Sequence, residues 1–416
     1  MTEKDLCCDN PCGCDNPCMP RVCRRDFIKM ALAAGLLAGC SPSPQPTAEP
    51  AIEPTVAPTV APTSEPVATP QALPPAWPTD GWLTSTPEEQ GMDSERLVRL
   101  LEFILEDRYQ FAGLYDLLVA RNGYVVLDAN FITARKGATR QLVCASRSIL
   151  SALIGIAIDK GYIDGVDQPM LSFFPDRTTA DGDPRKEAVT LYHLLTNTSG
   201  LQGRAQADEE GDQIQRILDR PMAADPGANF GFSADPYLSS AILQAATGVD
   251  PLDFAREHLF EPLGISDVTW ETDSDGLRTP TGMRLTSHDL ARFGYLYLSD
   301  GAWDGEQIVP AQWVADSLTS YTSTGCGLGF GYQWWIHGFG AYAAQSGRAQ
   351  CFAAPEQGVL AVTTSEPGGV GQSQASGLVE YFIIPAVKSS EPLPENPDMV
   401  AQLESLVQEV EGLFEP

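Results

Sequence analysis

The segment Cys144-Ala145-Ser146-Arg147-Ser148 places a thiol and a guanidinium three residues apart. A thiolate is a far better nucleophile toward carbonyl carbon than a hydroxyl, and a positive charge one helical turn away favours the thiolate form. Arg147 stays protonated, so it cannot accept the proton as a general base. The pair therefore predicts a thiol that could attack a carbonyl but lacks an adjacent proton acceptor.

The residues after Arg147 predict the helix that would carry this thiol. Apolar side chains recur there at helical spacing, and Gly161 follows Lys160 as a C-terminal stop. The apolar positions are Ile149, Leu150, Leu153, Ile154, Ala157 and Ile158. Cys144 is expected at the N-terminus of this helix.

Short β-prone segments lie toward both ends of the globular part of the chain. Asn122-Gly123 separates Leu114–Ala120 from Tyr124–Leu127, which is a strong signal for a β-hairpin. Four further strands are expected near the C-terminus, separated by turn residues. They are Gln333–Ile336, Tyr342–Ala344, Gln350–Ala354 and Val359–Thr364. The pattern predicts an α/β (α+β) domain whose antiparallel sheet is built from both ends of the chain, with helices between.

Several longer stretches resemble one known family, in family order. They are TLYHLLTNTSGL (190–201), LDRPMAADPGANFGF (218–232), LTSHDLARFGYLYLSDGAWDG (285–305) and GFGYQWW (329–335). With the Cys144 helix, they make the chain from Trp82 to Ala386 resemble the class C β-lactamase and penicillin-binding-protein-like serine hydrolases. The resemblance implies a β-lactamase/transpeptidase-like fold, in which an antiparallel sheet flanked by helices is joined to a mostly helical lobe.

The same resemblance implies where the catalytic residues should be. In the family's S-x-x-K motif a serine attacks the carbonyl and a lysine helps to take its proton, and here Cys144 and Arg147 hold those positions. Phe232 holds the position of the catalytic tyrosine. The third motif, K-T-G or H-x-G, corresponds to the turn Ser346-Gly347-Arg348, where Arg348 can supply a positive charge. His337 is expected in a loop rather than in this motif.

These departures predict a catalytically inactive member of the family that binds a small-molecule or cell-envelope ligand or partner. The alternative is a hydrolase of the esterase or amidase type with Cys144 as its nucleophile. No cofactor or metal is expected in either case. The formal net charge of −29 argues against nucleic-acid binding.

The N-terminus predicts export and a lipid anchor. Arg24 and Arg25 precede an apolar run at residues 30–38, as in a twin-arginine signal, and Leu37-Ala38-Gly39-Cys40 resembles a lipobox. Residues 1–39 are thus expected to be a signal peptide, and Cys40 to carry the lipid on the outer face of a bacterial cytoplasmic membrane. The Pro/Thr-rich residues 40–78 would form a tether, 79–386 the β-lactamase-like domain, and 387–416 a C-terminal tail with a short helix.

Cysteine usage divides at the same boundary. Six cysteines lie in the leader, at positions 7, 8, 12, 14, 18 and 23, where no histidine accompanies them. Three others, Cys144, Cys326 and Cys351, lie in the globular part. In an oxidising compartment two of these can pair and leave an odd thiol. The sequence leaves open which two pair.

Overall fold

A nine-stranded sheet forms the centre of the molecule in the computed structural model, which describes residues 76–203, 211–231, 235–325 and 327–414. Its strand order is β1-β3-β2-β14-β13-β12-β11-β10-β9, and every neighbouring pair is antiparallel except β1 with β3. The strands are β1 (Leu83–Thr84), β2 (Leu114–Arg121), β3 (Tyr124–Asn130), β9 (Thr322–Ser323), β10 (Gly329–Phe330), β11 (Trp335–Ile336), β12 (Tyr342–Gln345), β13 (Ala349–Ala354) and β14 (Val359–Ser365). The predicted antiparallel sheet built from both ends of the chain is confirmed, because β2 pairs directly with β14.

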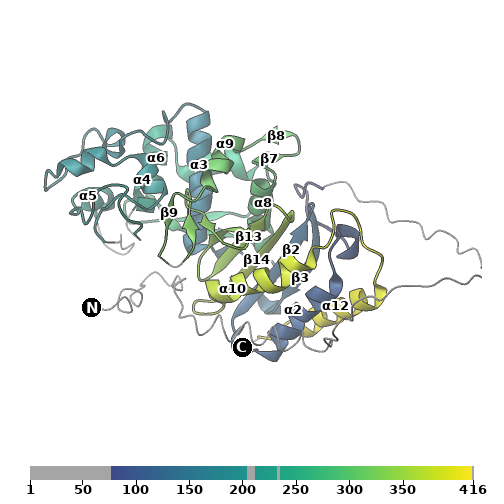
Figure 1. Cartoon of the computed structure of the whole chain (residues 1–416). Coiled ribbons are helices and arrows are strands. Elements are labelled where there is room, and N and C mark those ends of the chain that lie inside the picture. The colour runs from purple at the N-terminus through teal and green to yellow at the C-terminus, as the bar shows by residue number, and fades with distance from the viewer. Residues whose placement is uncertain (1–75, 204–210, 232–234, 326, 415–416) are drawn as a thin grey trace, which may run out of the picture.

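Small sheets and helices complete the architecture (Figure 1). A three-stranded sheet holds β4 (Arg140–Gln141), β6 (Arg278–Leu285) and β5 (Thr269–Thr272), and β7 (Ala302–Trp303) pairs with β8 (Glu306–Gln307). The α-helices are α2 (Ser94–Glu106), α3 (Ser146–Asp159), α4 (Leu191–Leu195), α5 (Gln213–Leu218), α6 (Asp235–Thr247), α7 (Pro251–Ala255), α8 (Ser287–Leu298), α9 (Ala311–Ser317), α10 (Gln372–Leu378), α11 (Ile384–Ala386) and α12 (Pro397–Val410).

The large sheet is covered on both faces. Figure 1 shows α2, α10 and α12 on one side of β2, β3 and β14, and α3 and α8 on the other. Every residue of β2 and of β14 is buried, as expected for strands between two layers of helices. At the tip of the predicted hairpin, Asn122 and Gly123 adopt φ values of 54° and 84°, as a type I′ turn requires.

Helix α3 runs through the largest core of the molecule. Every residue from Ile149 to Ala157 is buried, so burial extends around the whole circumference of the helix, beyond the predicted apolar stripe. Gly155 lies against the ring of Trp313 in α9, where an added Cβ would stand 2.4 Å from the indole Cγ. Glycine is therefore needed for α3 and α9 to approach this closely.

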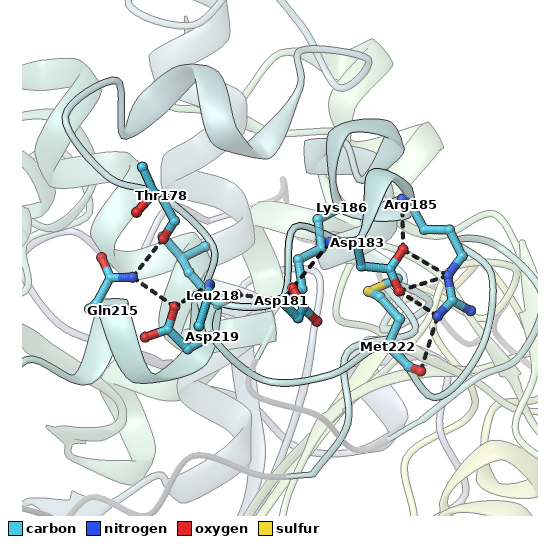
Figure 2. Close-up of polar contacts among 10 residues, drawn as sticks. Thr178, Asp181, Asp183, Arg185, Lys186, Gln215, Leu218, Asp219 and Met222 are labelled. Carbon is cyan, nitrogen blue, oxygen red and sulfur yellow. Dashed lines mark hydrogen bonds and ion pairs between the residues drawn. The ribbon is translucent and has the colours of Figure 1, made fainter.

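A lobe of helices α4, α5 and α6 lies to one side of the sheet (Figure 1), and a buried lysine holds part of it. The Lys186 ammonium, fully buried, donates to Asp181 Oδ1 at 2.6 Å and to the carbonyl of Leu218 in α5 at 2.8 Å (Figure 2). The hydrogen bond from Lys186 lowers the pKa of the Asp181 carboxyl. Gln215 adds a second link, since it donates to Asp219 and to the carbonyl of Thr178 (Figure 2).

Both ends of the described chain pack on the domain. Trp77 contacts the rings of Tyr295 and Trp303, with centroid separations of 5.5 and 5.4 Å. At the other end α12 packs against α2, and Phe414 stacks on Phe131. Within these described residues, none of the helices has the length and apolar character to cross a membrane.

Candidate functional site

Cys144 lies in a short 3₁₀ turn, Val143–Ala145, that runs directly into α3. The sequence therefore located the start of this helix correctly. The sulfur of Cys144 is disulfide-bonded, whereas Cys351, the other cysteine in the described part of the chain, is free and buried. Burial raises the pKa of the Cys351 thiol to about 12, so that thiol is not a nucleophile at neutral pH. Cys326 lies outside the described residues.

The backbone just before Cys144 is in a rare conformation. Val143 has φ of 50°, in the left-handed region that β-branched residues strongly disfavour. Such conformations persist only where surrounding contacts hold them, and they concentrate at functional sites. The turn thus fixes Cys144 at the positive end of a helix, where the helix dipole favours a developing negative charge.

The other predicted site residues of this region lie at different depths. Arg147, the second residue of α3, is half-buried. Ser146 is fully buried, and its hydroxyl has no hydrogen-bond partner among the residues described. Phe232 falls in 232–234, outside the described residues, so its predicted place beside Cys144 stays a prediction.

The turn at the third-motif position connects β12 to β13. Its Ser346 hydroxyl is fully buried and is engaged within the turn: it donates to the Ala349 carbonyl and accepts from the N–H groups of Arg348 and Ala349. The Arg348 guanidinium donates to Gln141 Oε1 at 2.7 Å. Because Gln141 precedes Cys144 by three residues, the structure brings Arg348 to the segment that carries the nucleophile position. Gly347 lies between Ser346 and Arg348 in the turn, and its carbonyl accepts a hydrogen bond from the Ser365 hydroxyl.

His337 lies in the loop directly after β11, as predicted, and it is buried there. Its Nε2 lies 3.2 Å from Gln345 Oε1, and its ring lies between those of Phe339 and Phe352. Burial lowers the pKa of His337 to about 4, so the imidazole is neutral at physiological pH.

The sequence missed two residues that support this site, Asn197 and Gln333. Both have positive φ, 56° and 64°, and the Gln333 amide donates to Asn197 Oδ1 at 2.8 Å. The glutamine lies in GFGYQWW, but nothing in that spacing marks it as different from its neighbours. Within the described residues, no group of histidine, cysteine, aspartate or glutamate side chains could hold a metal ion.

The chain belongs to the Beta-lactamase family, whose sequence pattern it matches over residues 88–374. The predicted resemblance and fold class are therefore confirmed. The chain is 31% identical to monacolin J acid methylbutanoyltransferase of Aspergillus terreus over 199 residues, which cover 43% of this chain and 47% of that protein. It is 23% identical to Esterase EstB of Burkholderia gladioli, covering 44% and 53% of the two chains. It thus spans about half the length of these relatives.

Solved structures show the same fold. A putative 6-aminohexanoate-dimer hydrolase from Bacillus anthracis superposes with a TM-score of 0.59 at 16% identity, covering 76% of this chain and 89% of that one. At this identity the likeness concerns the fold alone.

The relatives contradict the prediction that the chain is catalytically inactive, and they favour the alternative of a hydrolase. They are named as an acyltransferase and an esterase, which makes the family one of active hydrolases and acyltransferases. The prediction counted replaced side chains at motif positions and treated each as a loss. That count is insufficient for two reasons. A thiol is itself an acyl nucleophile. The residue types at three positions also do not decide whether the protein can transfer an acyl group.

Proposed function

We propose that the protein transfers or hydrolyses acyl esters, with Cys144 as the nucleophile once its disulfide has been reduced by a dithiol. One observation carries the proposal: a cysteine occupies the start of α3, on the strained turn at Val143, in a family whose named relatives act on acyl groups. While the disulfide is intact, its sulfur cannot attack. The oxidised protein is then a latent form of the enzyme.

The chemistry follows from a thiol at a helix N-terminus. The Cys144 sulfur attacks the ester carbonyl carbon, and the thiol proton leaves with the alcohol as the carbon–oxygen bond breaks. Negative charge on the carbonyl oxygen is favoured by the N-terminal end of α3. Water or an acceptor alcohol then attacks the acyl thioester, which gives an acid or a new ester and regenerates the thiol. The Arg147 and Arg348 guanidiniums stabilise charge and do not transfer protons.

The test is acylation of the reduced protein by p-nitrophenyl butyrate. After treatment with dithiothreitol, mass spectrometry should find a butyryl group on the peptide containing Cys144, and p-nitrophenol should be released continuously. Untreated protein and the reduced Cys144→Ala variant should show neither. Cys351→Ala, which removes the buried thiol outside the site, should behave as wild type. Turnover that survives Cys144→Ala, or a reduced wild type that takes up no acyl group, would refute the assignment.

We also propose that the protein is a lipoprotein of the bacterial envelope, exported through its twin arginines and anchored at Cys40 with its domain on the outer side of the membrane. The disulfide at Cys144 supports export, because disulfides persist in oxidising compartments. An export signal, the twin arginines, and a lipidation signal, the lipobox, occur in the expected order.

Cys40→Ala should move the protein from the membrane fraction to the soluble fraction or leave it unprocessed, since the lipid is attached to this sulfur. Metabolic labelling with a fatty acid, followed by cell fractionation, measures the change. Cys18→Ala is the matched control, because it removes a leader cysteine outside the lipobox. Equal labelling of the wild type and Cys40→Ala would show that the anchor lies elsewhere.

A further inference from the structure

We infer that Gln333 is a positioning residue that holds three segments of the site in place relative to one another: helix α3, the turn at residues 197–199 and the loop at 226–231. The expected effect on catalysis rests on the proposed function. Gln333 lies between β10 and β11. It acts through the segments that it joins.

The Gln333 side chain is buried, and its amide nitrogen lies within hydrogen-bond distance of three acceptors. Its Nε2 donates to the carbonyls of Leu195 and Leu194 at 2.9 and 3.2 Å and to Asn197 Oδ1 at 2.8 Å. Its backbone N–H donates to the same Leu195 carbonyl at 3.1 Å. These bonds close the C-terminal end of α4, whose last carbonyls have no partner within the helix.

The backbone carbonyl of Gln333 faces the nucleophile helix. It accepts a hydrogen bond of 2.6 Å from the Ser148 hydroxyl, and both residues are buried. Ser148 lies one helical turn beyond Cys144 on α3. Gln333, which follows Ser148 by 185 positions, therefore connects α3 to the end of α4.

The turn beyond Asn197 holds the loop that leads to Phe232. The Asn197 carbonyl accepts from the Gly231 N–H at 2.9 Å, and the Thr198 carbonyl accepts from the Gly227 N–H at 2.8 Å. Ser199 donates from its hydroxyl to Asp235 Oδ1 at 2.5 Å, on the far side of the loop. A shift of Gln333 would therefore reach both Cys144 and the loop at 226–231, which precedes the position of the family's catalytic tyrosine.

Backbone conformation marks the same residues. Val143, Asn197 and Gln333 all have φ between 50° and 64°. Asparagine adopts this region fairly readily, but glutamine and valine do so only where their surroundings impose it. The strained residues therefore lie at the junctions of the three site segments, which is where a fixed geometry is needed.

The test compares two reactions of the reduced protein at Cys144, acylation by p-nitrophenyl butyrate and alkylation by iodoacetamide. In Gln333→Met, which keeps the length of the side chain but has no donors, the acylation rate should fall on the order of 10- to 100-fold while alkylation changes less than about twofold. Asn197→Ala should act similarly. Asn197→Asp keeps the acceptor oxygen and should restore the wild-type ratio of the two rates. Gln312→Met makes the same chemical change on the surface of α9 and should alter neither rate.

An unchanged rate ratio in folded Gln333→Met and Asn197→Ala would overturn the positioning role, as would parallel losses in both reactions. If the reduced wild type is not acylated at all, the proposed function has failed and the crystal structure of Gln333→Met decides the geometric inference. The residues 197–199 and 227–231 should then be displaced relative to α3. An undisplaced turn would count against the inference independently of any activity.

Discussion

The triple variant Cys144→Ser, Arg147→Lys, Phe232→Tyr should hydrolyse a p-nitrophenyl ester without reductant, at least about 100-fold faster than untreated wild type. Serine forms no disulfide, so the variant cannot be held in a latent form. Lysine can accept and return a proton, which arginine cannot do. Tyrosine supplies a hydroxyl where phenylalanine has none. The three changes thus restore together the groups that the family's motifs combine.

Single changes in this set should give much less than the triple change. Residues that act as a unit are strongly non-additive, so a serine without a proton acceptor remains a weak nucleophile. A serine-directed fluorophosphonate provides the readout, with adduct formation at Ser148 excluded by peptide mapping. If the triple variant retains the wild-type circular dichroism but takes up no phosphonate, then the cleft is not shaped for acyl chemistry.

Ester turnover measured with and without dithiothreitol separates the thiol mechanism from the serine mechanism. The wild type should depend on dithiothreitol, and the triple variant should not. A wild type that turns over ester equally well before and after reduction would remove the disulfide from the mechanism. Because Cys351 is buried and its thiol pKa is raised to about 12, it should not contribute a background reaction at neutral pH.

Local patterns in the sequence predicted the elements that depend on nearby residues. The hairpin followed from Asn122-Gly123, whose positive φ values suit the turn, and α3 followed from apolar residues three and four positions apart. The predicted strands at 342–344, 350–354 and 359–364 agree with β12, β13 and β14 to within one residue at each end. Each of these signals arises within a short window of sequence.

The supports of the site arise from long-range contacts, which a single sequence does not reveal. Lys186 is mostly a surface residue type, yet here it is fully buried against a carbonyl 32 positions away. Gln333 gains its role from partners 136 to 185 positions away. The disulfide state of Cys144 depends in the same way on which cysteine the fold brings near it. The spacing of three cysteines could not decide that.

Arg140 and Asp116 form a buried ion pair beside the site, and breaking it should be strongly destabilising. Their side chains are 6% and 7% exposed, and Arg140 Nε donates to Asp116 Oδ2 at 3.3 Å. Asp116 also accepts hydrogen bonds from Asn130 at 2.7 Å and from the Thr364 hydroxyl. The Arg140 guanidinium lies 4.5 Å from the centroid of the Tyr115 ring. Arg140 begins β4, whose next residue, Gln141, holds Arg348.

Arg140→Met should lower the free energy of unfolding by about 3–5 kcal/mol, because it leaves the Asp116 carboxylate buried without its counter-ion. Urea denaturation followed by tryptophan fluorescence measures the loss. The double variant Asp116→Asn, Arg140→Met should recover more than half of it, since no buried charge then lacks a partner. Arg99→Met is the matched control: its ion pair with Glu95 is exposed, and such pairs contribute about 0.3–0.5 kcal/mol. Similar losses in Arg140→Met and Arg99→Met would mean that burial gives the Arg140 pair no special weight.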